Sequence, residues 1–259
     1  MSITFSMFTK HWNNHSIPEL GDLAKRLGFD GIELPVRPNY PVTPENVETN
    51  LLTASKQLAD QGINITSVAG PTNEGTIAAC AEAGIPVIRT SVAITDIGYL
   101  ASVEKAKQEF DEMVPLLEKH NVAVGIQNHC DQWVCNAMGL RDIVAPHNPK
   151  QIGVVWCAAH NALNGEDPDM AIDIIWSHLS QVKFKNAFWD RQVGPEAEDV
   201  RWRPFWTTGR QGLASWTWVA EELTKRGYNG VICLDAEYND EQSTERLIAD
   251  DLAFAKTLF

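Results

Sequence analysis

The sequence contains no apolar run long enough to span a membrane and no excess of basic residues. Its 34 acidic residues outnumber 21 basic ones, which gives a formal net charge of -13 over 259 residues. Nucleic acids and anionic membranes bind proteins through basic surfaces, so we expect neither as a partner. The opening residues MSITFSMFTKHW lack the basic segment and sustained apolar stretch of a secretion signal. We therefore expect a cytoplasmic protein.

Paired cysteines and a dinucleotide-binding loop are also missing. The five cysteines are odd in number and scattered over stretches that resemble strands or helices: Cys80, Cys130, Cys135, Cys157 and Cys233. We therefore expect reduced thiols and no disulfide framework. No G-x-G-x-x-G follows the first expected strand, which argues against a doubly wound nucleotide-binding sheet.

What the sequence does contain is a regular alternation of short apolar stretches and amphipathic stretches. Its 44% hydrophobic and 21% charged residues are typical of a globular protein with a sizeable core. Pro115 should kink its helix or divide it in two. The predicted strands are 3–8, 30–36, 64–70, 87–93, 122–129, 152–157, 181–187 and 230–238, and the predicted helices are 17–29, 45–62, 74–84, 102–120, 136–145, 167–179, 215–227 and 241–258.

Eight such units in a chain of this length predict a (β/α)8 TIM barrel that forms a single domain over residues 1–259. Active sites of this fold lie at the carboxyl ends of the strands. The side chains expected there, in chain order, are Lys10, His11, Trp12, Glu33, Arg37, Ser67, Arg89, Ser91, Gln127, Asn128, His129, Cys157, His160, Lys183, Lys185, Asn186, Asp235 and Glu237.

Five segments carry a family resemblance: LAKRLGFDGIEL, IQNH, VVWCAAHNALNGEDP, VKFKNA and GRQGLASWTWVAEELTKRGYNGVICLDAEY. Together they resemble the xylose isomerase-like TIM barrel superfamily, which includes sugar isomerases and epimerases. The resemblance implies one divalent metal held by a Glu on strand five, an Asp on strand six, a His on strand seven and a Glu on strand eight. It also implies that two of these carboxylates move the substrate proton.

The sequence departs from that ligand pattern at nearly every position. Gln127 stands where the resemblance implies Glu, Cys157 where it implies Asp, and Lys183 where it implies His. On the last strand, Asp235 or Glu237 could take the ligand position, because residues two apart point to the same side of a strand. The cofactor is therefore expected to be either none or one divalent ion, Mn, Mg or Zn.

Three interpretations of this cluster stay open. In the first, a metal is bound by a set drawn from Gln127, His129, Cys157, His160, Asp235 and Glu237, and a thiolate would favour zinc. In the second, Lys183 or a nearby arginine replaces the metal and stabilises an enediolate, while Glu237 or His160 moves the proton. In the third, catalysis is lost and the barrel only binds a sugar.

The spacing of Cys157 and His160 also allows a nucleophile and its base. An inert, buried structural thiol is the alternative we favour, because cysteine is among the most buried residue types. His160 is either a reactive group at the strand end or a histidine satisfied within its loop.

The segment 188–212 is expected to be a long functional loop, because connections of this length inside compact domains usually carry function. Trp206 and Arg210 belong to it and could contact a sugar or an anionic group, with a phosphate near TTGRQG. A tryptophan-rich lid or oligomer contact is the alternative. Glu33 and Arg89 either orient the substrate or form a structural ion pair.

We therefore predict an isomerase- or epimerase-type enzyme that moves a proton next to the carbonyl of a carbohydrate or polyol. Glu237, His160 and Lys183 are the predicted catalytic residues. The predicted substrate-binding residues are Glu33, Arg89, Gln127, His129, Asn186, Trp12, Trp206 and Arg210. A small-molecule carbohydrate is the expected partner, and a homo-oligomer stays open. The alternatives are a non-catalytic sugar-binding barrel and a metal-dependent lyase or hydrolase of the same superfamily.

Overall fold

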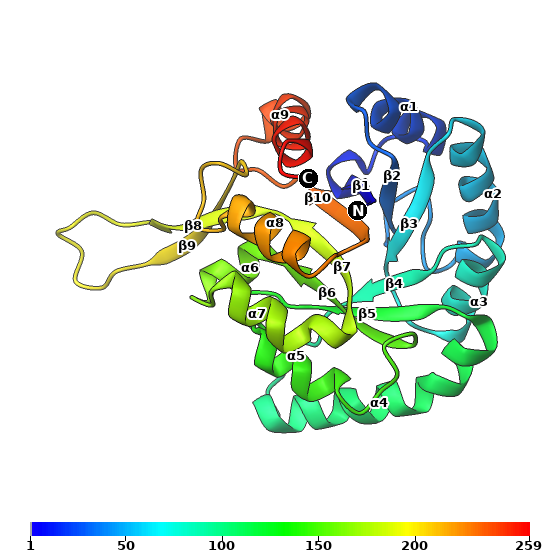
Figure 1. Cartoon of the computed structure of the whole chain (residues 1–259), viewed down its shortest axis with the longest axis horizontal. Coiled ribbons are helices and arrows are strands. Elements are labelled where there is room, and N and C mark those ends of the chain that lie inside the picture. The colour runs from blue at the N-terminus through cyan, green and yellow to red at the C-terminus, as the bar shows by residue number, and fades with distance from the viewer. Residues whose placement is uncertain (1) are drawn as a thin grey trace.

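Eight parallel strands close into a barrel, as the alternating sequence pattern predicts. The computed structural model describes residues 2–259. Around the barrel the strands follow the order β1, β10, β7, β6, β5, β4, β3, β2, and β1 pairs with both β10 and β2 to close it (Figure 1). Their bounds are β1 Ile3–Phe8, β2 Gly31–Pro35, β3 Asn64–Ala69, β4 Val87–Thr90, β5 Ala123–Gln127, β6 Ile152–Cys157, β7 Leu179–Phe184 and β10 Gly230–Asp235.

Helices follow the strands and cover the outside of the barrel (Figure 1). The first of them begins with a capping box between Ser16 and Glu19 and ends at Gly28, whose left-handed φ of 88° suits glycine. Helix and strand packing buries a continuous apolar layer between them. The helices are α1 Ile17–Leu27, α2 Val47–Asp60, α3 Glu74–Glu82, α4 Tyr99–His120, α5 Ala137–Val144, α6 Ala158–Leu163, α7 Pro168–Ile175, α8 Trp216–Lys225 and α9 Thr244–Lys256.

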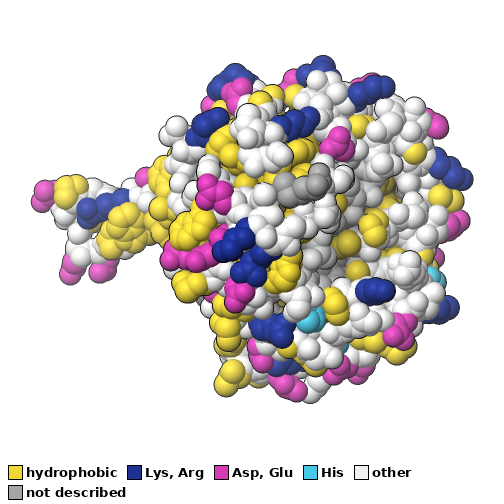
Figure 2. Space-filling model, viewed as in Figure 1, with side chains coloured by type: hydrophobic (Ala, Val, Ile, Leu, Met, Phe, Trp, Pro, Cys, Tyr) yellow, Lys and Arg dark blue, Asp and Glu magenta, His cyan; other side chains and the backbone are white. Residues whose placement is uncertain are grey.

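The segment expected to be a long loop is largely an antiparallel hairpin, which corrects that prediction. Strand β8 (Asn186–Arg191) pairs with β9 (Trp202–Thr207), and the hairpin projects from the barrel (Figures 1 and 2). Phe188 and Phe205 stack across the two strands with ring centroids 5.0 Å apart. Aromatic cross-strand pairs stabilise a hairpin, and the loop-like composition of the tip hid this pairing.

Two helices also differ from expectation. Pro115 lies inside α4, which continues as one helix instead of dividing. Proline removes one hydrogen bond to the carbonyl of Asp111, and both residues are exposed, so water can satisfy that carbonyl. The short helix α6, which begins directly after Cys157, was not predicted.

In the described residues 2–259, no helix combines the length and the apolar character needed to cross a bilayer.

Candidate active site

The mouth of the barrel is built in two layers, because alternate residues of a strand point to the same side. Lys183 lies in β7 and Lys185 directly follows that strand. Asp235 ends β10 and Glu237 follows two residues later. Each of these two strands therefore places one charged side chain, Lys183 or Asp235, in a lower layer. The second side chain of the same charge, Lys185 or Glu237, lies in an upper layer.

The lower layer is a closed network of buried charges. Lys183 Nζ lies 2.7 Å from Glu33 Oε1 and 2.6 Å from Asp235 Oδ1, and its side chain is 0% exposed. Arg89 Nε donates to the same Glu33 oxygen at 2.9 Å, while Ser67 Oγ donates to the other at 3.0 Å. Burial by itself would raise the pKa of Glu33, but the charges of Arg89 and Lys183 lower it to about 2. Glu33 is thus ionised and fully paired.

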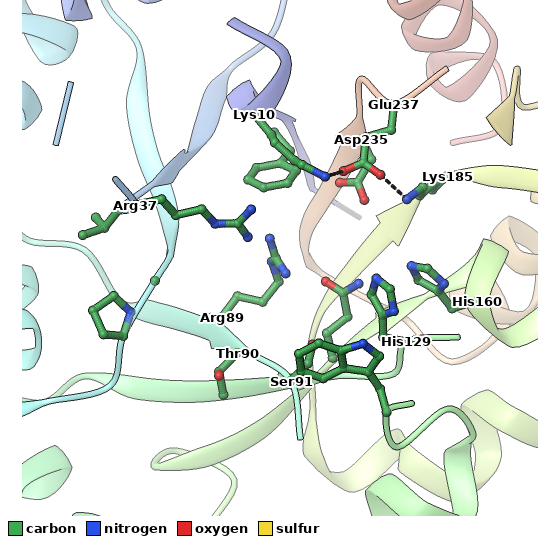
Figure 3. Close-up of a pocket in the computed structure, with 16 residues that line it drawn as sticks. Lys10, Arg37, Arg89, Thr90, Ser91, His129, His160, Lys185, Asp235 and Glu237 are labelled. Atoms are coloured by element: carbon green, nitrogen blue, oxygen red, sulfur yellow. Dashed lines mark hydrogen bonds and ion pairs between the residues drawn. The ribbon is translucent and has the colours of Figure 1, made fainter. Parts of the chain in front are cut away.

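A pocket of about 530 Å³ opens above this network, at the carboxyl ends of the strands (Figure 3). Its volume suits a small organic ligand. The residues that line it are Phe8, Lys10, Val36, Arg37, Gly70, Pro71, Arg89, Thr90, Ser91, Gln127, His129, Trp133, His160, Lys185, Asp235 and Glu237.

Glu237 is held between two lysines at one side of the pocket (Figure 3). Lys10 Nζ donates to Oε1 at 2.7 Å, and Lys185 Nζ donates to Oε2. Burial would raise the pKa of Glu237, but the two ammonium groups, Lys185 above all, hold it well below its usual range. Lys185 is 4% exposed, and its Nζ lies 3.6 Å from the centroid of the Trp206 ring. The carboxylate is ionised and a weak base.

His129 and His160 lie side by side in the pocket wall, with ring centroids 4.0 Å apart. The backbone of Cys130 binds both rings. His129 Nδ1 lies 2.8 Å from the Cys130 carbonyl oxygen, which can only accept, so the Nδ1 carries the proton. The Cys130 N–H donates to His160 Nδ1 at 3.2 Å, so in the neutral ring the proton lies on Nε2.

The backbone of one residue therefore fixes opposite tautomers in two neighbouring rings. Burial lowers the pKa of His129, and burial followed by the charge of Lys185 holds that of His160 well below its usual range. Both rings are neutral at neutral pH. His129 then presents an unprotonated Nε2, a base, and His160 presents an Nε2–H, a hydrogen-bond donor.

The side chains at the four positions of the implied metal site do not fit a divalent ion. Gln127 supplies a neutral amide, and burial raises the pKa of the Cys157 thiol to about 11. Lys183 brings a positive charge. At the last position, Asp235 Oδ1 contacts Lys183 Nζ, and both oxygens of Glu237 already bind ammonium groups. Mg and Mn prefer several free carboxylate oxygens, which this set does not offer.

One group of ligand-type side chains does come together among residues 2–259. Single donor atoms of His129, Cys130 and His160 lie within 4.8 Å of one another. Burial raises the pKa of Cys130 to about 12, and its thiol donates to Asp131 Oδ2 at 3.5 Å. Zinc binds the deprotonated thiolate, whereas this thiol is protonated. The positive charge of Lys185 acts on both Cys130 and His160 and would repel a divalent cation. This group is therefore not a preformed metal site.

Several residues predicted for the site lie outside the pocket. Lys183 and Glu33 are sealed in the lower layer. Cys157 is 0% exposed in a small apolar cluster, and Trp12 is 8% exposed in the main core. Asn186 binds Gly209 and Ala214 at the base of the hairpin.

Arg210 and Trp206 lie at different distances from the pocket. The guanidinium carbon of Arg210 is 3.7 Å from the Phe254 ring centroid, away from the mouth. Trp206 contacts both Lys185 and His160 from the hairpin side, so it borders the pocket. The sequence-predicted residues that line the pocket are Arg89, Gln127, His129, His160, Asp235 and Glu237.

Lys10, Arg37 and Lys185 were expected at the strand ends but were not predicted to be site residues. A period of two from Lys183 would have identified Lys185 as its partner one layer higher. Phe8 and Trp133 also line the pocket, and no sequence motif marks them.

Comparisons with known proteins show which family this chain belongs to. Among curated proteins, no sequence matches the chain. A D-psicose 3-epimerase with D-tagatose, from Clostridium cellulolyticum, is 14% identical with a TM-score of 0.75 and covers 98% of this chain and 99% of its own. A 3-keto-D-glucoside 4-epimerase from E. coli is 13% identical with a TM-score of 0.75, covering 99% and 100%.

A probable 3-DHS dehydratase from Bacillus anthracis is 15% identical with a TM-score of 0.72 and covers 96% of this chain and 98% of its own. At these identities the likenesses show the fold. The family described as xylose isomerase-like TIM barrel matches residues 22–258. This chain belongs to the xylose isomerase-like TIM barrel family.

Proposed function

We propose that this protein is an isomerase- or epimerase-type enzyme that moves a proton beside the carbonyl of a carbohydrate or polyol-derived substrate. The observation that carries the proposal is the pair of neighbouring histidines with opposite tautomers, next to the buried ammonium group of Lys185. The activities of the structural neighbours, two epimerases and a probable dehydratase, support the same class of chemistry.

The proton transfer begins at His129. Its Nε2 takes the proton from the carbon next to the carbonyl, and the electron pair of that C–H bond forms the carbon–carbon double bond of an enediolate. Return of the proton to the former carbonyl carbon, with transfer of the hydroxyl proton of the other carbon to the former carbonyl oxygen, completes an isomerisation. Return to the opposite face of the carbon that lost the proton, which needs a second acid, completes an epimerisation.

Lys185 and His160 stabilise the negative charge that develops on the carbonyl oxygen. Burial would lower the pKa of Lys185, but Glu237 raises it, so the side chain stays charged inside the pocket wall. The Nε2–H of His160 adds a neutral donor. A cation and a donor fixed before the reaction stabilise an oxyanion without reorganising.

Glu237 has a different role in this proposal from the acid/base role that the sequence suggests. Its two ion pairs favour the ionised form and reduce its basicity. We propose that it holds Lys10 and Lys185 in place, and that His129 is the base.

Solvent exchange tests the proposal directly. A panel of ketoses, sugar acids and sugar phosphates in deuterium oxide is incubated with the protein, and deuterium incorporation beside the carbonyl is measured by NMR. His129→Gln is expected to lower the exchange rate by about 10²-fold or more. His160→Gln, whose amide can still donate, is expected to lose less.

A matched control is His120→Gln, at the end of α4 where the chain leads into the opposite end of the barrel. It should exchange like the parent. Burial lowers the pKa of His129 from its usual 6.5, and the base must be unprotonated, so activity should be lost as the pH falls, with a midpoint below 6.5. Unchanged exchange in His129→Gln would remove His129 as the base. No exchange with any panel member would support the non-catalytic sugar-binding alternative.

A further inference from the structure

Two arginines face each other at the side of the pocket opposite the histidines (Figure 3). Arg37 follows β2 and Arg89 lies in β4, so the two come from different parts of the barrel. Their guanidinium carbons lie 5.7 Å and 4.8 Å from the centroid of the same ring, that of Phe8. Like charges held this close favour a negatively charged group between them.

Arg89 uses only part of its hydrogen-bonding capacity within the protein. Its Nε and one terminal nitrogen both lie 2.9 Å from the same oxygen of Glu33. Glu33 also neutralises Lys183 below it. Lys183 also contacts Asp235, so two cations share two carboxylates. Arg89 binds Glu33 through only two of its nitrogens and keeps further N–H donors for a group in the pocket.

Arg37 has no carboxylate of its own. Within residues 2–259, its half-buried side chain forms no ion pair and no side-chain hydrogen bond. Burial, followed by the charge of Arg89, lowers its pKa. A cation placed in this way gains from a nearby anion, because the attraction between opposite charges offsets both effects.

The charges in the pocket as a whole are positive, although the chain carries a net charge of -13. The pocket is lined by four cationic side chains, Lys10, Arg37, Arg89 and Lys185, and by the carboxylates of Asp235 and Glu237. Both carboxylates already contact lysines. A cationic pocket in an acidic protein indicates a ligand that carries negative charge.

The pocket wall also contains a hydrogen-bond acceptor without a donor. Gln127 is 3% exposed, lines the pocket, and its buried Oε1 has no hydrogen-bond partner. Buried polar atoms are rarely left unpaired, so this oxygen points to a donor on the ligand, such as a hydroxyl. Thr90 and Ser91 lie in the same wall beside Arg89.

We propose that the substrate is a polyhydroxylated acid or phosphate ester whose anionic group lies between Arg37 and Arg89, with a hydroxyl at Gln127 and the reacting carbons toward His129. The direction toward His129 rests on the proton-transfer function proposed above. The anion site itself rests only on the two arginines. Arginine suits this role because its planar guanidinium can bind carboxylate or phosphate through two parallel hydrogen bonds.

Calorimetric titration of the full chain with three probes tests the proposal. D-Gluconate carries a carboxylate, D-glucose 6-phosphate carries a phosphate, and D-glucitol carries neither. At least one anionic probe should bind more tightly than D-glucitol, and the tighter of the two identifies the anionic group. If D-glucitol binds as tightly as both anions, or if neither anion binds at millimolar concentration, the proposal is overturned.

Arg37→Gln should weaken binding of the preferred anion about tenfold or more, which corresponds to loss of one charge-assisted contact. Arg37→Lys, which keeps the charge but not the planar fork, should recover part of the loss. The control Arg191→Gln makes the same charge change on the exposed hairpin and should bind like the parent. Equal affinities of Arg37→Gln and Arg191→Gln would overturn the anion site.

Anion binding is measured without turnover, so the two proposals fail separately. Tight binding of an anion without deuterium exchange would leave the anion site standing and remove the proton-transfer function. Exchange with neutral ketoses alone would do the reverse.

Discussion

Lys183, in β7, and Lys185, just after that strand, are the same residue type and point to the same side, yet they lie in different chemical environments. Lys183 is sealed beneath the pocket between Glu33 and Asp235. Lys185, one layer higher, pairs with Glu237 and lines the pocket beside His160. Only the upper lysine can touch a ligand.

The difference between the two layers separates support from chemistry. In the lower layer the cations and carboxylates pair with one another, and Lys183 and Glu33 are fully buried and do not line the pocket. In the upper layer each charged group keeps one side open to the pocket. The lower layer holds Arg89 and Asp235 in place at the bottom of the pocket. The upper layer supplies the reactive groups.

Lys183→Met should give the largest effect, and that effect should be on stability. Removal of the ammonium group leaves the buried carboxylates of Glu33 and Asp235 with less positive charge, and breaking such a buried pair costs about 3–5 kcal/mol. The free energy of unfolding is measured by denaturant titration. Lys185→Met is the matched control, and if it destabilises the fold as much as Lys183→Met does, the distinction between the layers is wrong.

Lys185→Met should have its main effect on catalysis. Loss of the cation beside the developing oxyanion should lower the deuterium-exchange rate by about 10²–10³-fold. Lys185→Met should lose less stability than Lys183→Met, because Glu237 keeps Lys10 as a partner and is 22% exposed. Exchange at the parental rate would remove Lys185 from the proposed mechanism.

Cys157→Asp should give the smallest effect, namely no gain of a bound metal. The new carboxylate would lie opposite Lys183 in the strand pairing and outside the pocket, so it would pair with an ammonium group. Metal analysis of parent and variant, purified without chelator, measures this. A stoichiometric divalent ion in the variant alone would show that the cysteine is the missing ligand and that the lysines do not exclude a metal.

The strands of the barrel and most residues of the mouth could be predicted from sequence because both follow local periodicity. Alternation of short apolar and amphipathic stretches predicts the βα units, and the ends of the strands give His129, His160, Asp235 and Glu237. The hairpin was missed because its pairing joins residues on either side of a polar tip. The roles of the lysines were missed because depth along a barrel axis depends on neighbouring strands.

The sequence by itself determined the type and order of the chemical groups, including Gln127 and Cys157 where the family resemblance implies carboxylates and Lys183 where it implies a histidine. Only the tertiary structure decided which of two lysines, two residues apart, reaches the pocket. It also decided which ring nitrogen carries the proton in each histidine. The reason is physical. Burial, ion pairing and tautomer depend on atoms supplied by other strands and by the backbone of Cys130, which the spacing of side chains along one segment does not encode.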